Sequence, residues 1–563
     1  MQQVRRVRRA ALLALTLLSA CAAADPSSGG APPVRASAGG SSVFGAYLAG
    51  KVALSQGNAD AAANAFLRAL AARPNDPELQ QQAFFAALLA GRSEAAQLAR
   101  QLPDNQMALL VIGDEAAKAS RWAEAERAFR ALPRQGLTQL LQPLLIAWAQ
   151  QGDGRTDVAL ATLRPLVEGP RFRGLFALHA GMIADVANRP ADAARFYRIA
   201  QTEMPDSNLR LAQVLASWQA RTGHPAEAQR LLANLVAAAP DMAIAVPTLL
   251  STAGKRPVAR PTDGMAEAYV ALAAALHAER STDVATAMLR LALDLRPDFS
   301  AARVMQADLL APKQPAAALQ MLAGIPASDP ISAIVRLRRV SLMEKLGRSD
   351  DAVEELDKLA RDYPESPLPE MTLGDMLRIK QRFPAAIAAY DRAAARIRQP
   401  GPNDWPLYYN RGIAYERANQ WSKAEADFKH ALALAPDQPF VLNYLGYSWA
   451  DKGEHLPEAR RMLQRAAEKR PNDGAVVDSL GWVMLRQGQV ADAVRLLERA
   501  VELDSEDATI NGHLGDAYWA AGRKIEAQYQ WRRALTLNPT ADDAAKLEAK
   551  LNPSQGGAVV SGQ

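Results

Sequence analysis

The chain has 563 residues, of which 49% are hydrophobic and 22% are charged. This composition excludes wholesale disorder, and the length exceeds what one compact core holds, so we expect several domains or one long repeat array. Only 6% of the residues are aromatic, and alanine and leucine fill long stretches, which favours helices over sheets. The single cysteine excludes an intrachain disulfide framework and a zinc site built from several cysteines.

The first twenty residues have the pattern of a secretory signal peptide. Residues 1–10 carry four arginines, and residues 11–20 form an apolar run that is shorter than the roughly 20 apolar residues that span a bilayer. Because this segment holds no acidic residue, its removal lowers the formal net charge from +5 to +1. A mature chain of this charge does not indicate a nucleic-acid partner.

Leu18, Ser19 and Ala20 precede the only cysteine of the chain, Cys21. Small residues before a cysteine resemble the lipobox of bacterial lipoproteins, in which the thiol is diacylated and the new N-terminus is acylated. The resemblance implies a lipid anchor on Cys21, with acyl groups such as palmitate, and three acyl chains hold a protein more firmly than one. Ala22 in place of aspartate implies sorting to the outer membrane, facing the periplasm. The alternative is a secreted protein with an incidental cysteine.

Residues 21–42 follow as a segment rich in glycine, serine, proline and alanine. This composition is typical of a flexible tether. A tether of this length spans roughly 25 Å on average. We therefore expect the folded part of the chain to stand off the membrane.

From residue 43 onward, the main signal is a period of about 34 residues. It is clearest near the C-terminus, where small and proline residues recur at Gly412, Gly446, Gly481 and Gly515, at Ala431, Ala466, Ala500 and Ala534, and at Pro436, Pro471 and Pro539. Small residues let two antiparallel helices approach closely, and proline ends the second helix because it cannot continue one. One such pair cannot bury its apolar face alone, so the pairs are expected to stack.

This pattern of small and large residues resembles the tetratricopeptide repeat. The resemblance implies an all-α fold, a tetratricopeptide repeat superhelix that forms an α-solenoid of up to fourteen antiparallel helix pairs. The expected divisions are a signal peptide at 1–20, the tether at 21–42, an N-terminal degenerate array at 43–242, an interrupting loop at 243–264, a middle array at 265–400, a well-formed C-terminal array at 401–541, a capping helix at 542–551 and a disordered tail at 552–563.

The period breaks at 243–264, where Pro247, Gly254, Pro257 and Pro261 stand close together. Proline and glycine interrupt helices, so this stretch predicts a partial helix followed by a loop. The loop is either a hinge or partner-contacting segment, or simply a repeat that has drifted from the pattern.

The sequence holds no motif of a phosphate-binding loop, a zinc protease, a serine hydrolase or a Cys-x-x-Cys pair. The six histidines are scattered, and no two of them stand four residues apart. We therefore expect no enzymatic activity, no catalytic residue, no metal site and no cofactor.

In tetratricopeptide superhelices, the first helix of each pair lines the concave face, and fixed repeat positions point into it. Transferred to this chain, those positions predict a partner-binding groove formed by Tyr409, Arg417, Phe440, Asn443, Tyr447, Asp478, Trp482, Arg486, Asp516 and Trp519, with His513 beside them. Five of these residues are aromatic, and aromatic and arginine side chains dominate binding hot spots. The alternative is that the aromatic residues pack against neighbouring helices. The set does not match the lysine and asparagine clamp that recognises a C-terminal carboxylate.

Across most of its length, the chain resembles one group of proteobacterial outer-membrane lipoproteins, which share its lipobox, tether, weak early repeats, interrupted middle and strong final repeats. Residues 443–447 and 478–482 look like their most recognisable stretches. The resemblance implies an adaptor that binds a periplasmic carboxyl-terminal processing protease and brings cell-wall hydrolases to it. Two alternatives remain: a structural lipoprotein of a polysaccharide, pilus or secretion machine, and a peptidoglycan-binding protein that uses Trp482 and Trp519.

Overall fold

The computed structural model describes residues 42–136, 138–204 and 208–552, and within these ranges it contains 30 α-helices, two 3₁₀ helices and no strand. The predicted signal peptide, Cys21, the tether up to residue 41 and the predicted tail from residue 553 lie outside the described residues. None of the described helices is long and apolar enough to cross a membrane.

The described helices form fourteen pairs, each joined by a short turn. The first six pairs are α1 (Val43–Ser55) with α2 (Ala59–Ala72), α3 (Pro77–Ala90) with α4 (Glu94–Ala99), α5 (Gln106–Lys118) with α6 (Trp122–Arg130), α7 (Thr138–Gly152) with α8 (Thr156–Glu168), α9 (Arg173–Val186) with α10 (Pro190–Glu203), and α11 (Leu209–Arg221) with α12 (Pro225–Ala238).

Eight further pairs follow after a short interruption. They are α14 (Pro261–Ala278) with α15 (Thr282–Leu295), α16 (Ser300–Leu310) with α17 (Pro315–Ala323), α18 (Ser332–Lys345) with α19 (Ser349–Asp362), α20 (Leu368–Ile379) with α21 (Phe383–Arg396), α22 (Trp405–Arg417) with α23 (Trp421–Leu434), α24 (Pro439–Lys452) with α25 (Leu456–Lys469), α26 (Gly474–Arg486) with α27 (Val490–Leu503), and α28 (Ala508–Ala520) with α29 (Lys524–Thr536). The single helix α30 (Ala541–Leu551) ends the described chain, and the short η2 (Pro402–Asp404) precedes α22. The predicted all-α solenoid of helix pairs is confirmed.

Many of these pairs close around a glycine on their first helix. At Gly412 of α22, a Cβ atom would lie 2.7 Å from the ring of Phe428 on α23, so a larger residue does not fit without displacing the ring. The backbone of the first helix therefore packs directly on the aromatic side chain of the second. Within the described chain, the same contact at a spacing of sixteen residues occurs in six pairs, at Gly50–Phe66, Gly113–Phe129, Gly181–Tyr197, Gly374–Tyr390, Gly412–Phe428 and Gly515–Trp531.

The interruption at 243–264 contains more helix than predicted. The 3₁₀ helix η1 (Pro240–Ala245) leads into α13 (Val246–Thr252), and α14 already begins at Pro261, so only residues 253–260 are irregular. The predicted order, a partial helix followed by a loop, is present, but the loop ends at residue 260 and not at 264 because α14 begins at Pro261. Pro247 and Pro261 stand in the first turn of their helices, where proline's fixed φ is compatible with a helix and no backbone hydrogen bond is lost.

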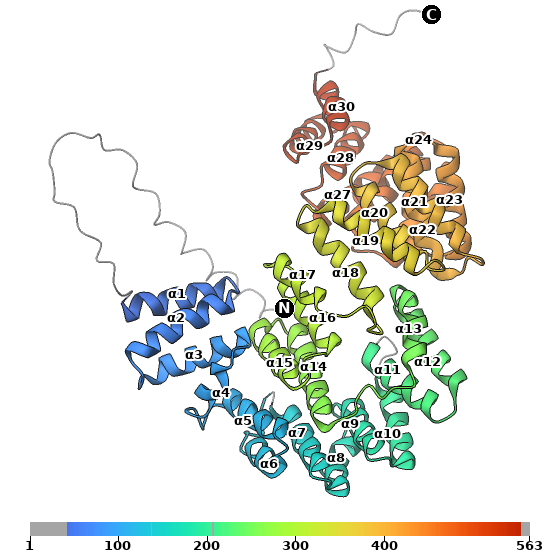
Figure 1. Cartoon of the computed structure of the whole chain (residues 1–563). Helices are drawn as coiled ribbons and strands as arrows, with labels where there is room; N and C mark the ends of the chain where they lie inside the picture. The colour runs from blue at the N-terminus through green and yellow to red at the C-terminus, as the bar shows by residue number, and fades with distance from the viewer. Residues whose placement is uncertain (1–41, 137, 205–207, 553–563) are drawn as a thin grey trace, which may run out of the picture.

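Helices α1 to α13 form an arc, and α14 and α15 lie on its inner side (Figure 1). α14 contacts α5, α7 and α9, and α15 contacts α3 and α5. One continuous apolar core joins these helices, from Ala53 in α1 to Ala302 in α16. Beyond it, α16 to α18 connect to a second coil that contains α19 to α29 (Figure 1).

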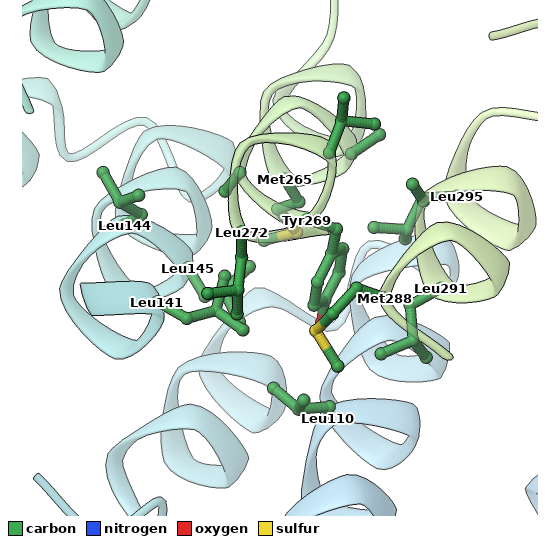
Figure 2. Packing of buried hydrophobic residues seen from close by; sticks show 14 of the residues in the cluster. Leu110, Leu141, Leu144, Leu145, Met265, Tyr269, Leu272, Met288, Leu291 and Leu295 are labelled. Atoms are coloured by element: carbon green, nitrogen blue, oxygen red, sulfur yellow. The ribbon is translucent and has the colours of Figure 1, made fainter. Parts of the chain in front are cut away.

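The contact between α14–α15 and the arc is mainly apolar. Figure 2 shows side chains of α14 and α15 facing those of α5 and α7 across this core. The residues labelled there are Met265, Tyr269 and Leu272 of α14, Met288, Leu291 and Leu295 of α15, Leu110 of α5, and Leu141, Leu144 and Leu145 of α7.

A small number of polar contacts fix α14 and α15 in place. The Tyr269 hydroxyl donates hydrogen bonds to both carboxylate oxygens of Asp114, at 2.9 and 3.0 Å. Asp114 is fully buried, and burial raises the pKa of its carboxyl well above the usual range, although the Tyr269 hydrogen bonds oppose this rise. In the second half of α15, Arg290 donates to the backbone oxygen of Leu89 at 2.8 Å. The inner side of the N-terminal arc is therefore occupied by the chain's own helices.

Gly264, near the start of α14, lies against the Trp148 ring of α7, and a Cβ atom at this position would overlap the ring. We expect Gly264→Ala to destabilise the protein by about 1–3 kcal/mol, because a close-packed core resists an added methyl group. Gly254→Ala is the matched control, since no atom lies within 4 Å of a Cβ added there. Differential scanning calorimetry compares the two, and equal melting temperatures would contradict the docking of α14 against Trp148.

Candidate partner-binding face

The predicted partner-binding residues come from the first helices of four successive pairs, α22, α24, α26 and α28. α24 contacts α26, and α26 contacts α28. Tyr409 of α22 packs against Tyr444 of α24. We call the ten predicted residues on these helices the A-helix face. Some of these residues make contacts around Tyr409, and others make contacts around His513.

His513 of α28 is the centre of the larger group. Its Nδ1 atom lies 2.9 and 3.0 Å from the two carboxylate oxygens of Asp478 on α26. The indole ring of Trp482 stacks on the imidazole at 4.1 Å between centroids, with an angle of 17° between the planes. The ring of Tyr447 on α24 lies 6.0 Å from the same imidazole. Three helices thus converge on one buried histidine.

The charge on His513 depends on its acidic neighbours. Burial by itself lowers the pKa of the imidazole, but the carboxylates of Asp478, Asp516 and Asp451 outweigh burial, so the pKa is raised above its ordinary value. The histidine and Asp478 therefore form an ion pair at pH values below this raised pKa. Only 4% of Asp478 is exposed, so its carboxylate is used within the chain.

The repeat positions place His513 beside the predicted groove and not among its binding residues. The repeat position that points into the groove is Gly512, which has no side chain, and His513 follows it. Its pairing with Asp478, 35 residues earlier, is the signal that was missed. The two residues stand almost one repeat apart, on adjacent first helices that the solenoid stacks together.

The aromatic residues of the face differ in exposure. Phe440 and Trp519 remain 45% and 43% exposed, as expected for side chains that can meet a partner. Trp482 is half-buried, and its indole Nε1 atom has no hydrogen-bond partner within the described chain. The same holds for the amide oxygen of Asn443, also half-buried. Phe440 and Trp519 therefore leave apolar surface of the face open, whereas the two polar atoms without a partner are themselves buried.

Tyr409 belongs to a separate aromatic group. Its ring makes an edge contact with Tyr444 at 5.9 Å and lies 6.1 Å from Phe428. Burial raises the pKa of the Tyr409 hydroxyl, while Arg378 lowers it to a smaller degree. The contacts of Tyr409 are those of a packed side chain, as the alternative interpretation of the aromatic residues expected.

The charged residues of the set are partly engaged within the chain. Arg417 is exposed and lies 3.3 Å from its neighbour Glu416. Arg486 is exposed and donates to the backbone oxygen of Asp451 at 3.0 Å. Asp516 accepts hydrogen bonds from Trp531 at 2.9 Å and from Lys550 of α30 at 2.7 Å. Asp516 therefore attaches the last helix of the described chain to α28.

Models of the tetratricopeptide repeat match residues 46–80, 335–366, 368–437 and 479–545. Among curated proteins, a tetratricopeptide-repeat-containing protein of Pseudomonas aeruginosa is 31% identical over 182 residues, which cover 32% of this chain and 30% of that protein. The aspartyl/asparaginyl beta-hydroxylases of mouse and human are 24% identical over 199 residues, which cover 34% of this chain and 26% of each enzyme. The chain thus spans less than a third of the length of these relatives.

The chain also resembles three solved structures. The Cut9–Hcn1 hetero-tetramer of the APC/C is 15% identical and covers 91% of this chain and 96% of its own, with a TM-score of 0.38. Yeast Tom70 is 14% identical and covers 80% of this chain and 96% of its own, with a TM-score of 0.33. YrrB, described as a tetratricopeptide-repeat protein with an unusual peptide-binding site, is 20% identical and covers 35% of this chain and 98% of its own, with a TM-score of 0.28.

Asp478→Asn tests the electrostatics of the His513 group. In the wild type we expect His513 to titrate above about 6.5, and in the variant below it, because burial then acts without the Asp478 charge. A raised folded-state pKa means that the stability His513 contributes is present below about pH 6.5 and is lost as the pH rises through that pKa. NMR titration of the His513 ring measures the shift.

Asp492→Asn, exposed on α27, is the control. An unchanged His513 pKa in Asp478→Asn would contradict the ion pair between Asp478 and His513.

Proposed function

We propose that this tetratricopeptide-repeat protein is a non-catalytic scaffold that a lipid on Cys21 anchors to the outer membrane, and that binds periplasmic proteins through the A-helix face. The observation that carries the proposal is the difference between the two ends of the solenoid. α14 and α15 fill the inner side of the N-terminal arc. The C-terminal first helices keep Phe440 and Trp519 exposed. Tetratricopeptide repeats bind protein partners, so the available face is the better candidate.

We further propose that the bound partner is a carboxyl-terminal processing protease or one of its cell-wall hydrolase substrates. The support is the sequence resemblance to the adaptor lipoproteins, together with the matched repeats. Catalysis then resides in the partner. The scaffold contributes effective concentration, because two proteins held on one tethered chain meet far more often than two that diffuse freely.

Partner capture tests the scaffold. We expect Trp482→Ala combined with Trp519→Ala to reduce the partner recovered with the lipidated protein by about tenfold or more, because truncating a hot-spot aromatic costs about 2 kcal/mol or more. Ile525→Ala on α29 is the control, since that side chain is 84% exposed and lies on the second helix of its pair. Affinity purification from the native envelope with quantitative mass spectrometry measures recovery.

Unchanged recovery of every periplasmic protein in the tryptophan variant would retire the A-helix face as the binding surface. Recovery of a processing protease, with hydrolases retained when that protease is inactivated, supports the adaptor. Recovery of an outer-membrane barrel or an export complex without a protease would favour the structural alternative.

Fractionation tests the anchor. We expect Cys21→Ser to move the protein from the membrane to the soluble periplasmic fraction, because the acyl chains that hold it are lost. Ala22→Asp is the matched variant that keeps the cysteine, and it should keep the protein on a membrane while changing which membrane. A Cys21→Ser protein that still sediments with the outer membrane would contradict the lipid anchor.

A further inference from the structure

A cavity of about 350 Å³ remains between α9 and α11 of the N-terminal arc and the later helices α14, α16 and α18. Most of the side chains that line it are apolar, among them Leu175, Leu178, Met182, Val214, Val270 and Met305. Binding sites for small molecules are typically cavities of this size with an apolar lining and a few polar groups. The cavity therefore has the properties of a site for a small molecule.

His179 of α9 adds a polar group to this lining. Only 1% of the residue is exposed, and burial lowers the pKa of its imidazole to about 3, so the ring is neutral. The indole N–H of Trp148 donates to its Nδ1 atom at 2.9 Å. An indole N–H can only donate, so Nδ1 is the acceptor and the single proton of the neutral ring is on Nε2.

The Nε2–H group of His179 has no hydrogen-bond partner among the described residues. A buried donor without an acceptor costs free energy, because it has lost its hydrogen bond to water. A ligand in the cavity that carries an acceptor atom restores this hydrogen bond. The Trp148 contact keeps the imidazole in the orientation that leaves Nε2–H free.

The charged side chains of the lining pair with one another. Arg210 donates from Nε to Glu267 at 3.1 Å, and Arg338 of α18 forms an ion pair with Asp308 of α16. Two arginines thus face two carboxylates in the described lining, and no net charge remains to neutralise that of a ligand. Burying an unpaired charge is costly, so the cavity favours an uncharged molecule.

The volume of the cavity limits the size of the ligand. In another protein, a dry apolar cavity of about 150 Å³ binds benzene, so a volume more than twice as large has room for roughly ten to fourteen non-hydrogen atoms. Met182 and Met305 make the lining adaptable, because methionine is unbranched and flexible. Such a lining suits an aliphatic chain that has no fixed shape.

We propose that this cavity binds an uncharged aliphatic molecule of this size with one acceptor oxygen, as in a medium-chain alcohol or ester. The chain of the ligand lies among the apolar side chains, and its oxygen accepts a hydrogen bond from Nε2 of His179. The site uses no residue of the A-helix face. It therefore goes beyond the proposed function and does not depend on it.

Isothermal titration calorimetry of the full mature chain tests the class of ligand. The probes are 1-octanol, octane and octanoate, which have chains of the same kind and differ at the polar end. We expect 1-octanol to bind about fivefold more tightly than octane, because one net hydrogen bond separates the two. Octanoate should bind about tenfold more weakly than 1-octanol, since the cavity has no free cation for its charge.

Ala271→Phe tests the location of the site. Ala271 of α14 is half-buried and lines the cavity, so a ring at this position takes the place of the ligand. We expect it to weaken binding of 1-octanol by about tenfold or more. Ala275→Phe is the matched control, because Ala275 is exposed on the same helix and lies outside the lining. Circular dichroism melting checks that both variants stay folded.

His179→Phe tests the hydrogen bond. The substitution keeps an aromatic ring but removes the N–H group, so the preference for 1-octanol over octane should disappear. It also removes the acceptor of Trp148, and if this variant does not fold, the comparison of the two probes on the wild type still decides. No binding of 1-octanol, equal affinity for 1-octanol and octane, or binding that Ala271→Phe leaves unchanged would overturn the proposal.

Discussion

The docking of α14 and α15 inside the N-terminal arc is the contact on which the rest of the architecture depends. A row of helix pairs buries its apolar surface only between neighbours, and its inner side stays open unless something fills it. Here the chain fills it with its own helices, through an apolar core and the buried contact between Tyr269 and Asp114. The next pair, α16–α17, leads from that centre toward the second coil (Figure 1).

Because α14 and α15 fill the inner side of the N-terminal arc, the two halves of the solenoid differ in which of their surfaces stay open. In the N-terminal half, the inner surface packs against α14 and α15 of the same chain. The C-terminal half stacks its first helices side by side without an inserted pair, so exposed aromatic side chains remain on them.

The His513 group shows how the binding half keeps its shape while carrying charge. Its imidazole joins α26 to α28 by a carboxylate pair and a stacked indole. Most of that contact is buried, so its polar groups hold α26 and α28 together and are not available to a partner.

The sequence alone predicts the helix pairs, because small, large and proline residues recur with a period of about 34 residues, and in six pairs a glycine on the first helix packs against an aromatic ring sixteen residues later. The same period locates the first helices and hence most of the candidate face. The docking of α14 and α15 was not predictable in this way, since Asp114 and Tyr269 stand 155 residues apart and neither carries a local signal of its partner. Burial was also decided by tertiary structure: the repeat positions assign Asp478, Tyr409 and Trp519 alike to one face. In the structure, Asp478 is buried beside His513, Tyr409 is half-buried against Tyr444 and Phe428, and Trp519 stays exposed.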